Sequence, residues 1–241
     1  MKYLKHALFV VCITVFAFSV LNLSGIFMEY HNGENEYSEL SEFTYEKPKK
    51  ENTEWVDDLE INYDELKAIN NDFVGWIKIN DTPVNYPVVH GKNNEYYLHH
   101  TFYGKSNFSG AIFMNAENTD IDLDQNVIIY GHNMKNNTMF SSIRKYVDQK
   151  YWEQHKFIQL YTKTGNHIYK IYSAYTTGSS SDSYKYSFAN DESFQAYLDK
   201  TKSLSDYDTG VELNLNSKIL TLSTCTGDSA TRYVVHAVRV K

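Results

Sequence analysis

KILTLSTC, residues 218–225, and RYVVHAVRV, residues 232–240, are the two stretches that decide the fold. Alternation of period two predicts that the first is a strand, and one of its faces carries Ile219, Thr221, Ser223 and Cys225. The polar, glycine-containing stretch TGDSAT can turn the chain between the two. If they pair as antiparallel neighbours, the end of one strand lies beside the start of the next. We therefore expect Cys225 to meet Arg232.

A third stretch, NVIIYGH at residues 126–132, has the same design. Ile128, Tyr130 and His132 share a face, and His132 is reached as the strand gives way to Gly131 and a polar loop. If this strand runs parallel to residues 218–225, both present their C-terminal ends at one rim. A thiol, an imidazole and a guanidinium would then form a single patch.

The remaining chain breaks into short apolar or alternating runs bounded by Gly, Asn, Asp and Pro. With the three above, these runs make eight expected strands: residues 74–80, 84–90, 110–115, 126–132, 155–162, 167–177, 218–225 and 232–240. Helical spacing predicts short packing helices around Leu59, Tyr63 and Leu66, around Met139, Ile143 and Val147, and around Phe194, Tyr197 and Leu198. So many short strands favour a mainly β fold, a closed or nearly closed eight-stranded barrel.

The N-terminus predicts a membrane anchor. Residues 7–28 carry no charged side chain and are long enough for a helix that crosses a bilayer. Lys2 and Lys5 precede this run and glutamates follow it, so we expect residues 1–6 in the cytoplasm and the rest outside the cell. A cleaved signal peptide is the competing interpretation. Residues 29–54 are polar and predict a stalk, and residues 55–241 predict one extracytoplasmic domain.

Composition excludes several classes of function. The formal net charge is −7 and no dense block of Lys or Arg occurs, which argues against a nucleic-acid partner. Cys225 is the only cysteine outside the apolar run, so the domain has no internal disulfide, and this thiol is either a buried apolar group or a nucleophile. One cysteine with scattered histidines lacks the paired spacing of zinc ligands, and we expect no metal and no cofactor.

The three side chains of the expected patch suit covalent catalysis. A thiolate attacks an amide carbonyl, and an imidazole donates a proton to the departing amine and later accepts one from the incoming amine. Arg232 stays protonated and can stabilise the developing oxyanion. Because His132 ends a strand, we prefer it as the acid and base over His99, His100 and His236.

TLSTC followed by an arginine at the start of the final strand, together with YGHNM, resembles the signature of the sortase family. The N-terminal helix and the run NNEYYLHH are most similar to class B sortases of Gram-positive bacteria. The resemblance implies an eight-stranded barrel and a cysteine transpeptidase that cleaves a C-terminal sorting motif of secreted proteins, of the NPxTN or a related type, after Thr. It implies a thioester on Cys225, which an amine of a peptidoglycan cross-bridge or stem peptide resolves.

The resemblance also implies a peptide groove. By match to the family's pocket, its lining would comprise Asn94, Leu98, Tyr130 and Ser223, with Thr224 beside the nucleophile and Tyr184 and Tyr186 from a long loop. The gap between Cys225 and Arg232 is short for class B, which changes the shape expected for that loop. Two other functions fit the same residues, a cell-wall Cys/His peptidase or amidase that uses water as acceptor, and a non-catalytic adhesion module.

Overall fold

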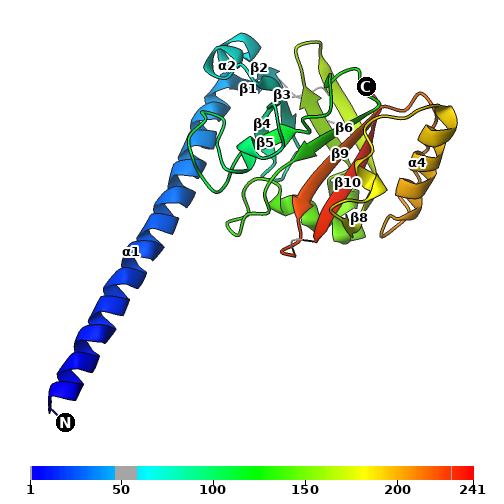
Figure 1. Cartoon of the computed structure of the whole chain (residues 1–241). Coiled ribbons are helices and arrows are strands. Elements are labelled where there is room, and N and C mark those ends of the chain that lie inside the picture. The colour runs from blue at the N-terminus through cyan, green and yellow to red at the C-terminus, as the bar shows by residue number, and fades with distance from the viewer. Residues whose placement is uncertain (1, 47–58, 229) are drawn as a thin grey trace.

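A closed eight-stranded barrel dominates the structure, a computed structural model that describes residues 2–46, 59–228 and 230–241 (Figure 1). Its strands are β3 (Phe73–Lys78), β4 (Asn85–Val89), β5 (Ile112–Met114), β6 (Asn126–Tyr130), β7 (Phe157–Tyr161), β8 (Asn166–Gly178), β9 (Ile219–Cys225) and β10 (Thr231–Arg239). They follow one another around the barrel in the order β10-β8-β7-β3-β4-β5-β6-β9. All eight strands expected from the sequence are therefore confirmed.

The strand pairing expected around the reactive residues is also confirmed. β6 pairs in parallel with β9, and β9 pairs antiparallel with β10. Buried apolar side chains occupy both sides of these strands: Leu220, Leu222 and Val235 belong to the main core, whereas Ile219 and Val238 belong to a second cluster. This two-sided burial holds β9 in the middle of the molecule and fixes the position of its C-terminal end.

The second cluster lies beneath α4 (Asp191–Ser203), on the outer face of the barrel. Asn190 caps the N-terminus of this helix: its side chain accepts from the backbone N–H of Ser193, and the Ser193 side chain accepts from the backbone N–H of Asn190, a capping box that satisfies both groups. Phe194 and Leu198 are fully buried, as their helical spacing predicted. A 3-10 turn, η4 (Asp182–Tyr184), lies between α4 and the strands β8 and β10 (Figure 1).

Short helices fill the other connections. They are α2 (Tyr63–Ile69), η2 (Tyr96–Leu98), η3 (Ser141–Val147) and α3 (Gln149–Gln154). The helix expected around Leu59 starts only at Tyr63, because Leu59 belongs to the short strand β2 (Leu59–Ile61). Val147 was expected to share a buried face with Ile143, but it is largely exposed, since η3 has the tighter 3-10 geometry rather than an α-helical period.

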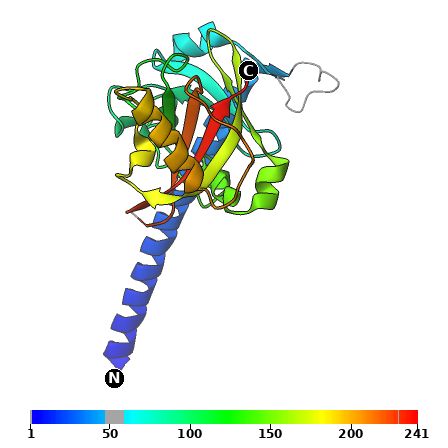
Figure 2. The same ribbon diagram turned by 90° about the vertical axis from the view of Figure 1, so that its right-hand side faces the viewer.

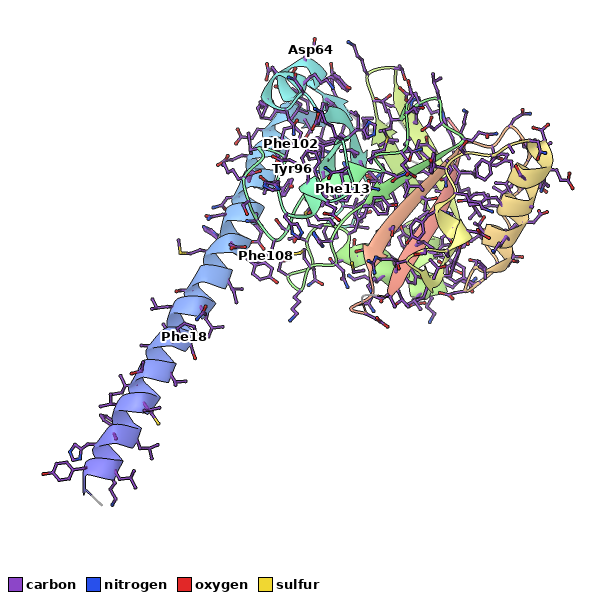
Figure 3. The ribbon with its side chains drawn as sticks, viewed as in Figure 1. Phe18, Asp64, Tyr96, Phe102, Phe108 and Phe113 are labelled. Carbon is purple, nitrogen blue, oxygen red and sulfur yellow. The ribbon has the colours of Figure 1, made fainter. Side chains whose placement is uncertain are left out.

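One long helix, α1 (Lys2–Leu40), forms the N-terminus and is long and apolar enough to cross a membrane. Its N-terminal half extends away from the barrel in both views (Figures 1 and 2), and Phe18 projects from this bare part (Figure 3). The C-terminal part packs on the domain, where the side chains of Tyr37 and Leu40 are buried.

This packing corrects the prediction of a polar stalk at residues 29–54. Residues 29–40 are helical, and η1 (Ser41–Phe43) and β1 (Thr44–Glu46) follow, the latter paired with β2. Tyr30, Gly33, Tyr37 and Leu40 recur at helical intervals among the polar residues, and this face contacts the barrel. The rest of the predicted stalk and the expected start of the domain at Trp55 lie outside the described residues.

Candidate active site

A cavity of about 310 Å³ opens at the C-terminal ends of β6 and β9. Its lining residues are Asn94, Leu98, Phe113, Tyr130, Gly131, His132, Ser179, Tyr184, Ser223, Thr224, Cys225 and Arg232. The expected thiol, imidazole and guanidinium thus share one cavity.

Cys225 and Arg232 face each other across the barrel strands. They are directly opposite in the register of β9 and β10, where paired residues project to the same face. Both side chains are half-buried, and Cys225 is a free thiol. Arg232 Nη1 donates to the carbonyl oxygen of Thr231 at 2.8 Å. The pairing therefore places Arg232 next to Cys225 on the same face of the sheet, as the sequence predicted.

His132 directly follows Gly131 at the end of β6 and is half-buried. Its Nε2 lies 2.7 Å from the carbonyl oxygen of Leu98, and because a carbonyl only accepts, Nε2 carries the proton. Nδ1 is then the nitrogen that can accept a proton. Burial lowers the pKa of His132, and the nearby His99 adds to this, while the bond to Leu98 acts in the opposite direction. The ring is therefore mainly neutral near pH 7.

Close backbone packing holds the His132 strand against the nucleophile strand. The N–H of Gly131 donates to the Ser223 carbonyl at 3.2 Å, and the Thr224 hydroxyl donates to the Gly131 carbonyl at 2.8 Å. A Cβ atom at Gly131 would lie 2.5 Å from the Ile112 side chain, closer than real contacts allow. Glycine at this position therefore leaves room for the side chains of Ile112 and Phe140, which pack against the end of β6.

Aromatic rings form one side of the cavity. Tyr184, from η4, stacks over Tyr130 with ring centroids 6.2 Å apart, and its hydroxyl lies 2.9 Å from Ser223 Oγ. Phe113, from β5 and labelled in Figure 3, also packs against Tyr130, with ring centroids 5.3 Å apart. Asn94 is held by hydrogen bonds to Asn115 and to the backbone of Ala116. The cavity thus combines apolar and aromatic surface with a few fixed polar groups, as peptide sites do.

Most of the residues expected in the groove line this cavity: Asn94, Leu98, Tyr130, Tyr184, Ser223 and Thr224. Tyr186 does not, and interacts with Glu117 instead. Phe113, Gly131 and Ser179 also line it and were not singled out in the sequence. Phe113 lies in an entirely apolar strand with no alternation to mark the exposed side. Only its pairing with Tyr130 across β5 and β6 reveals it.

None of the rival histidines lines the cavity. His236 is fully buried beneath α4, on the same outer face of β10 as Arg232 but further along the strand. His99 is exposed, and His100 stacks on Tyr96, which is labelled in Figure 3. The geometry therefore favours His132 over these three as the partner of Cys225.

Comparison with known proteins decides the family. The sortase domain family model matches residues 77–240, which include every residue that lines the cavity. The chain belongs to the sortase family. Sortases are cysteine transpeptidases, and a cavity that holds Cys225, His132 and Arg232 agrees with this chemistry.

The similar sortases are class B enzymes. Sortase B of Staphylococcus aureus is 37% identical over 182 residues, which cover 74% of this chain and 75% of that protein. A crystal structure of Clostridium perfringens sortase B is 37% identical with a TM-score of 0.70, covering 74% of this chain and 99% of that one. A Staphylococcus aureus sortase B-substrate complex has a TM-score of 0.78 at 32% identity, covering 89% and 99% of the two chains.

Proposed function

We propose that this sortase cleaves a C-terminal sorting motif of secreted proteins after Thr and transfers the protein to an amine of peptidoglycan. One observation carries the proposal: the thiol of Cys225, the ring of His132 and the guanidinium of Arg232 line the same cavity. The similarity to a sortase B solved with a substrate supports it.

The first half of the reaction acylates the enzyme. The Cys225 thiol gives its proton to the neutral His132 ring, and the sulfur attacks the backbone carbonyl carbon of the Thr in the motif. The negative charge that forms on the carbonyl oxygen is stabilised by Arg232, which the strand pairing holds beside the sulfur. His132 then donates its proton to the departing amine, the peptide bond breaks and a thioester remains.

The second half transfers the acyl group. A peptidoglycan amine, from a cross-bridge or a stem peptide, attacks the thioester carbonyl, and His132 accepts its proton. The tetrahedral intermediate collapses, the carbon–sulfur bond breaks, and the proton returns to the Cys225 sulfur. Because burial lowers the pKa of His132, the ring is neutral and ready to accept a proton at the start of each half.

We assign the peptide groove to six side chains. Leu98, Tyr130 and Tyr184 provide apolar and aromatic surface, and Asn94, Ser223 and Thr224 provide polar groups near the nucleophile. The hydroxyl of Thr224 already donates to the Gly131 carbonyl, which supports the His132 strand, so in the groove this oxygen acts only as an acceptor. Tyr186 lies outside the cavity and is not part of this assignment.

Intact-mass analysis tests the proposal. Full-length protein in detergent micelles is incubated with a library of NPxTN-type peptides, with and without an added amine. We expect a thiol-dependent acyl adduct that the amine discharges into a ligated product, and no adduct with Cys225→Ala. Discharge by water at the same rate with or without amine would indicate a peptidase or amidase instead. Adduct on the Cys225→Ala chain would reject the nucleophile.

We further propose that residues 7–28 anchor the enzyme in the cell membrane, with residues 1–6 in the cytoplasm and the barrel outside. The apolar, exposed surface of this part of α1 supports the proposal. Protease added to intact protoplasts should degrade the barrel and leave a short membrane-bound fragment. A barrel that is protected until the membrane is permeabilised would contradict this orientation.

A further inference from the structure

Beneath the cavity wall that carries Tyr184 lies a buried network of polar side chains that the proposed reaction does not use. Its members come from four strands and two helical segments: Asn126 from β6, Tyr175 from β8, Thr221 from β9, His236 from β10, Tyr197 from α4 and Ser183 from η4. Each of these side chains is at most 3% exposed. Val234 and Val238 precede and follow His236 on the same face, so an apolar residue would suit the position. A buried imidazole there is costly unless both of its nitrogens are hydrogen-bonded, which makes its partners informative.

The chemistry of the partners fixes every proton around His236. The hydroxyl of Thr221 donates its single proton to Asn126 Oδ1 at 2.8 Å, so at the 2.8 Å contact between Thr221 and His236 the ring Nδ1–H must be the donor. In the neutral ring Nε2 is then an acceptor, and the Tyr175 hydroxyl donates a hydrogen bond to it at 3.1 Å.

The hydrogen bonds continue from Tyr175 into η4. Because the Tyr175 hydroxyl donates its only proton to His236, its oxygen accepts a hydrogen bond from the hydroxyl of Ser183 at 2.8 Å. Asn126 Nδ2 donates to the Tyr197 hydroxyl and to the backbone carbonyl of Lys185. Tyr197 in turn donates to the carbonyl of Ser183 at 3.3 Å. The two residues on either side of Tyr184 are therefore held by one closed set of hydrogen bonds.

We propose that His236 is a positioning residue for the substrate groove, which acts through Tyr175 and Ser183 to hold Tyr184 against Ser223 and over Tyr130. A histidine suits this place because its neutral ring donates at one nitrogen and accepts at the other, which joins Thr221 to Tyr175. The functional part of the inference rests on the proposed function, in which Tyr184 lines the peptide groove. The structural part, that the network holds η4 in place, does not.

Single-hydroxyl variants test the inference with little change of shape. Tyr175→Phe removes the link between His236 and Ser183. Tyr172→Phe is the matched control, because Tyr172 lies on the same strand, is equally buried and also packs on the His236 ring, but its hydroxyl bonds to Thr201 of α4 at 2.9 Å. Tyr175→Phe loses two buried hydrogen bonds and Tyr172→Phe loses one, and only the first variant loses a bond to the segment that carries Tyr184.

Hydrogen exchange of the full-length chain in detergent micelles gives the first readout. We expect amides of residues 179–190 to exchange about fivefold faster in Tyr175→Phe, the factor for losing about one net hydrogen bond, and to be unchanged in Tyr172→Phe. His236→Phe, which keeps an aromatic ring but removes both hydrogen bonds of the imidazole, should raise the exchange rate of these amides further. Unchanged exchange in both Tyr175→Phe and His236→Phe would overturn the inference. This measurement needs no substrate.

Steady-state transfer of a sorting-motif peptide gives the second readout. We expect KM for the peptide to rise about fivefold in Tyr175→Phe while kcat changes less than twofold, because the groove is perturbed but the reacting groups are not. Tyr172→Phe should match the wild type in both constants. Equal effects of the two variants would show that the network only stabilises the fold. Absence of transfer by the wild type would reject the proposed function and leave the exchange result to decide the network.

Discussion

The buried ring of His236 should make the stability of the barrel depend on pH. Burial lowers the pKa of His236 from 6.5 to about 3, and the groups packed against it are Thr221 and three tyrosines, Tyr172, Tyr175 and Tyr197. Burial raises the pKa of each of these tyrosines, so none is charged at neutral or acidic pH. The ring is thus neutral in the folded chain at any pH above about 4.

The sign follows from where the proton binds. Below pH 6.5 the unfolded chain takes up a proton on His236 that the folded chain does not, so acid favours unfolding and stability falls as the pH is lowered. Stability from this residue is fully present above pH 6.5 and decreases by about 1.4 kcal/mol per pH unit below it. Between pH 8 and pH 5 the loss is about 2 kcal/mol.

Urea unfolding measures this loss. The full-length chain in nonionic micelles is unfolded at pH 8 and at pH 5, and the fluorescence of the buried Trp76 reports the transition. His236→Gln cannot titrate, so its free energy of unfolding should change by about 2 kcal/mol less between the two pH values than that of the wild type. Its own stability at pH 8 does not matter, since only the change with pH is compared. The same change in both proteins would refute the reasoning.

Three other substitutions have expected outcomes. Arg232→Ala should lower kcat/KM for transfer about 150-fold, the effect of losing about 3 kcal/mol of oxyanion stabilisation, and an equally active Arg232→Lys would show that the charge alone suffices. Gly131→Ala should lower the free energy of unfolding by about 1–3 kcal/mol, because its Cβ would overlap the Ile112 side chain. Thermal melting measures this change, and an unchanged Tm would contradict the close packing of Ile112 against Gly131. Leu40→Ala should lower the free energy of unfolding by about 2–5 kcal/mol, whereas Leu23→Ala, on the exposed part of α1, should not change it. Equal melting temperatures of the two variants would show that α1 does not pack on the barrel.

The sequence predicted that Cys225, His132 and Arg232 converge, because strand periodicity is a local signal. In residues 218–225 and 126–132, alternation assigned the faces, and the strand ends then placed Cys225, His132 and Arg232 at one rim. The partner of His132 was not predictable in this way. Leu98 contributes its backbone carbonyl, which every residue has, so no side-chain pattern marks it.

Two features were missed for different physical reasons. The helical face of Tyr30, Gly33, Tyr37 and Leu40 is sparse, and the acidic residues between them gave the segment the composition of a linker. The Tyr37 hydroxyl donates to the Gly110 carbonyl at 2.6 Å, a contact between residues far apart in the chain. The His236 network is likewise built from four strands and two helical segments, and a sequence pattern shows no contact of that kind.

If residues 7–28 span a bilayer as proposed, the unbroken course of α1 determines how far the cavity lies from that bilayer. Tyr37 lies about 14 Å along the helix axis from Met28, the last residue of the apolar run. In both ribbon views the C-terminal end of β9 lies on the side of the barrel nearer the N-terminal half of α1 (Figures 1 and 2). With residues 7–28 in a bilayer, the mouth of the catalytic cavity would sit low over the lipid headgroups and could not swivel freely. The proposed substrates, a secreted protein and an amine of peptidoglycan, would both have to reach the cavity at that level.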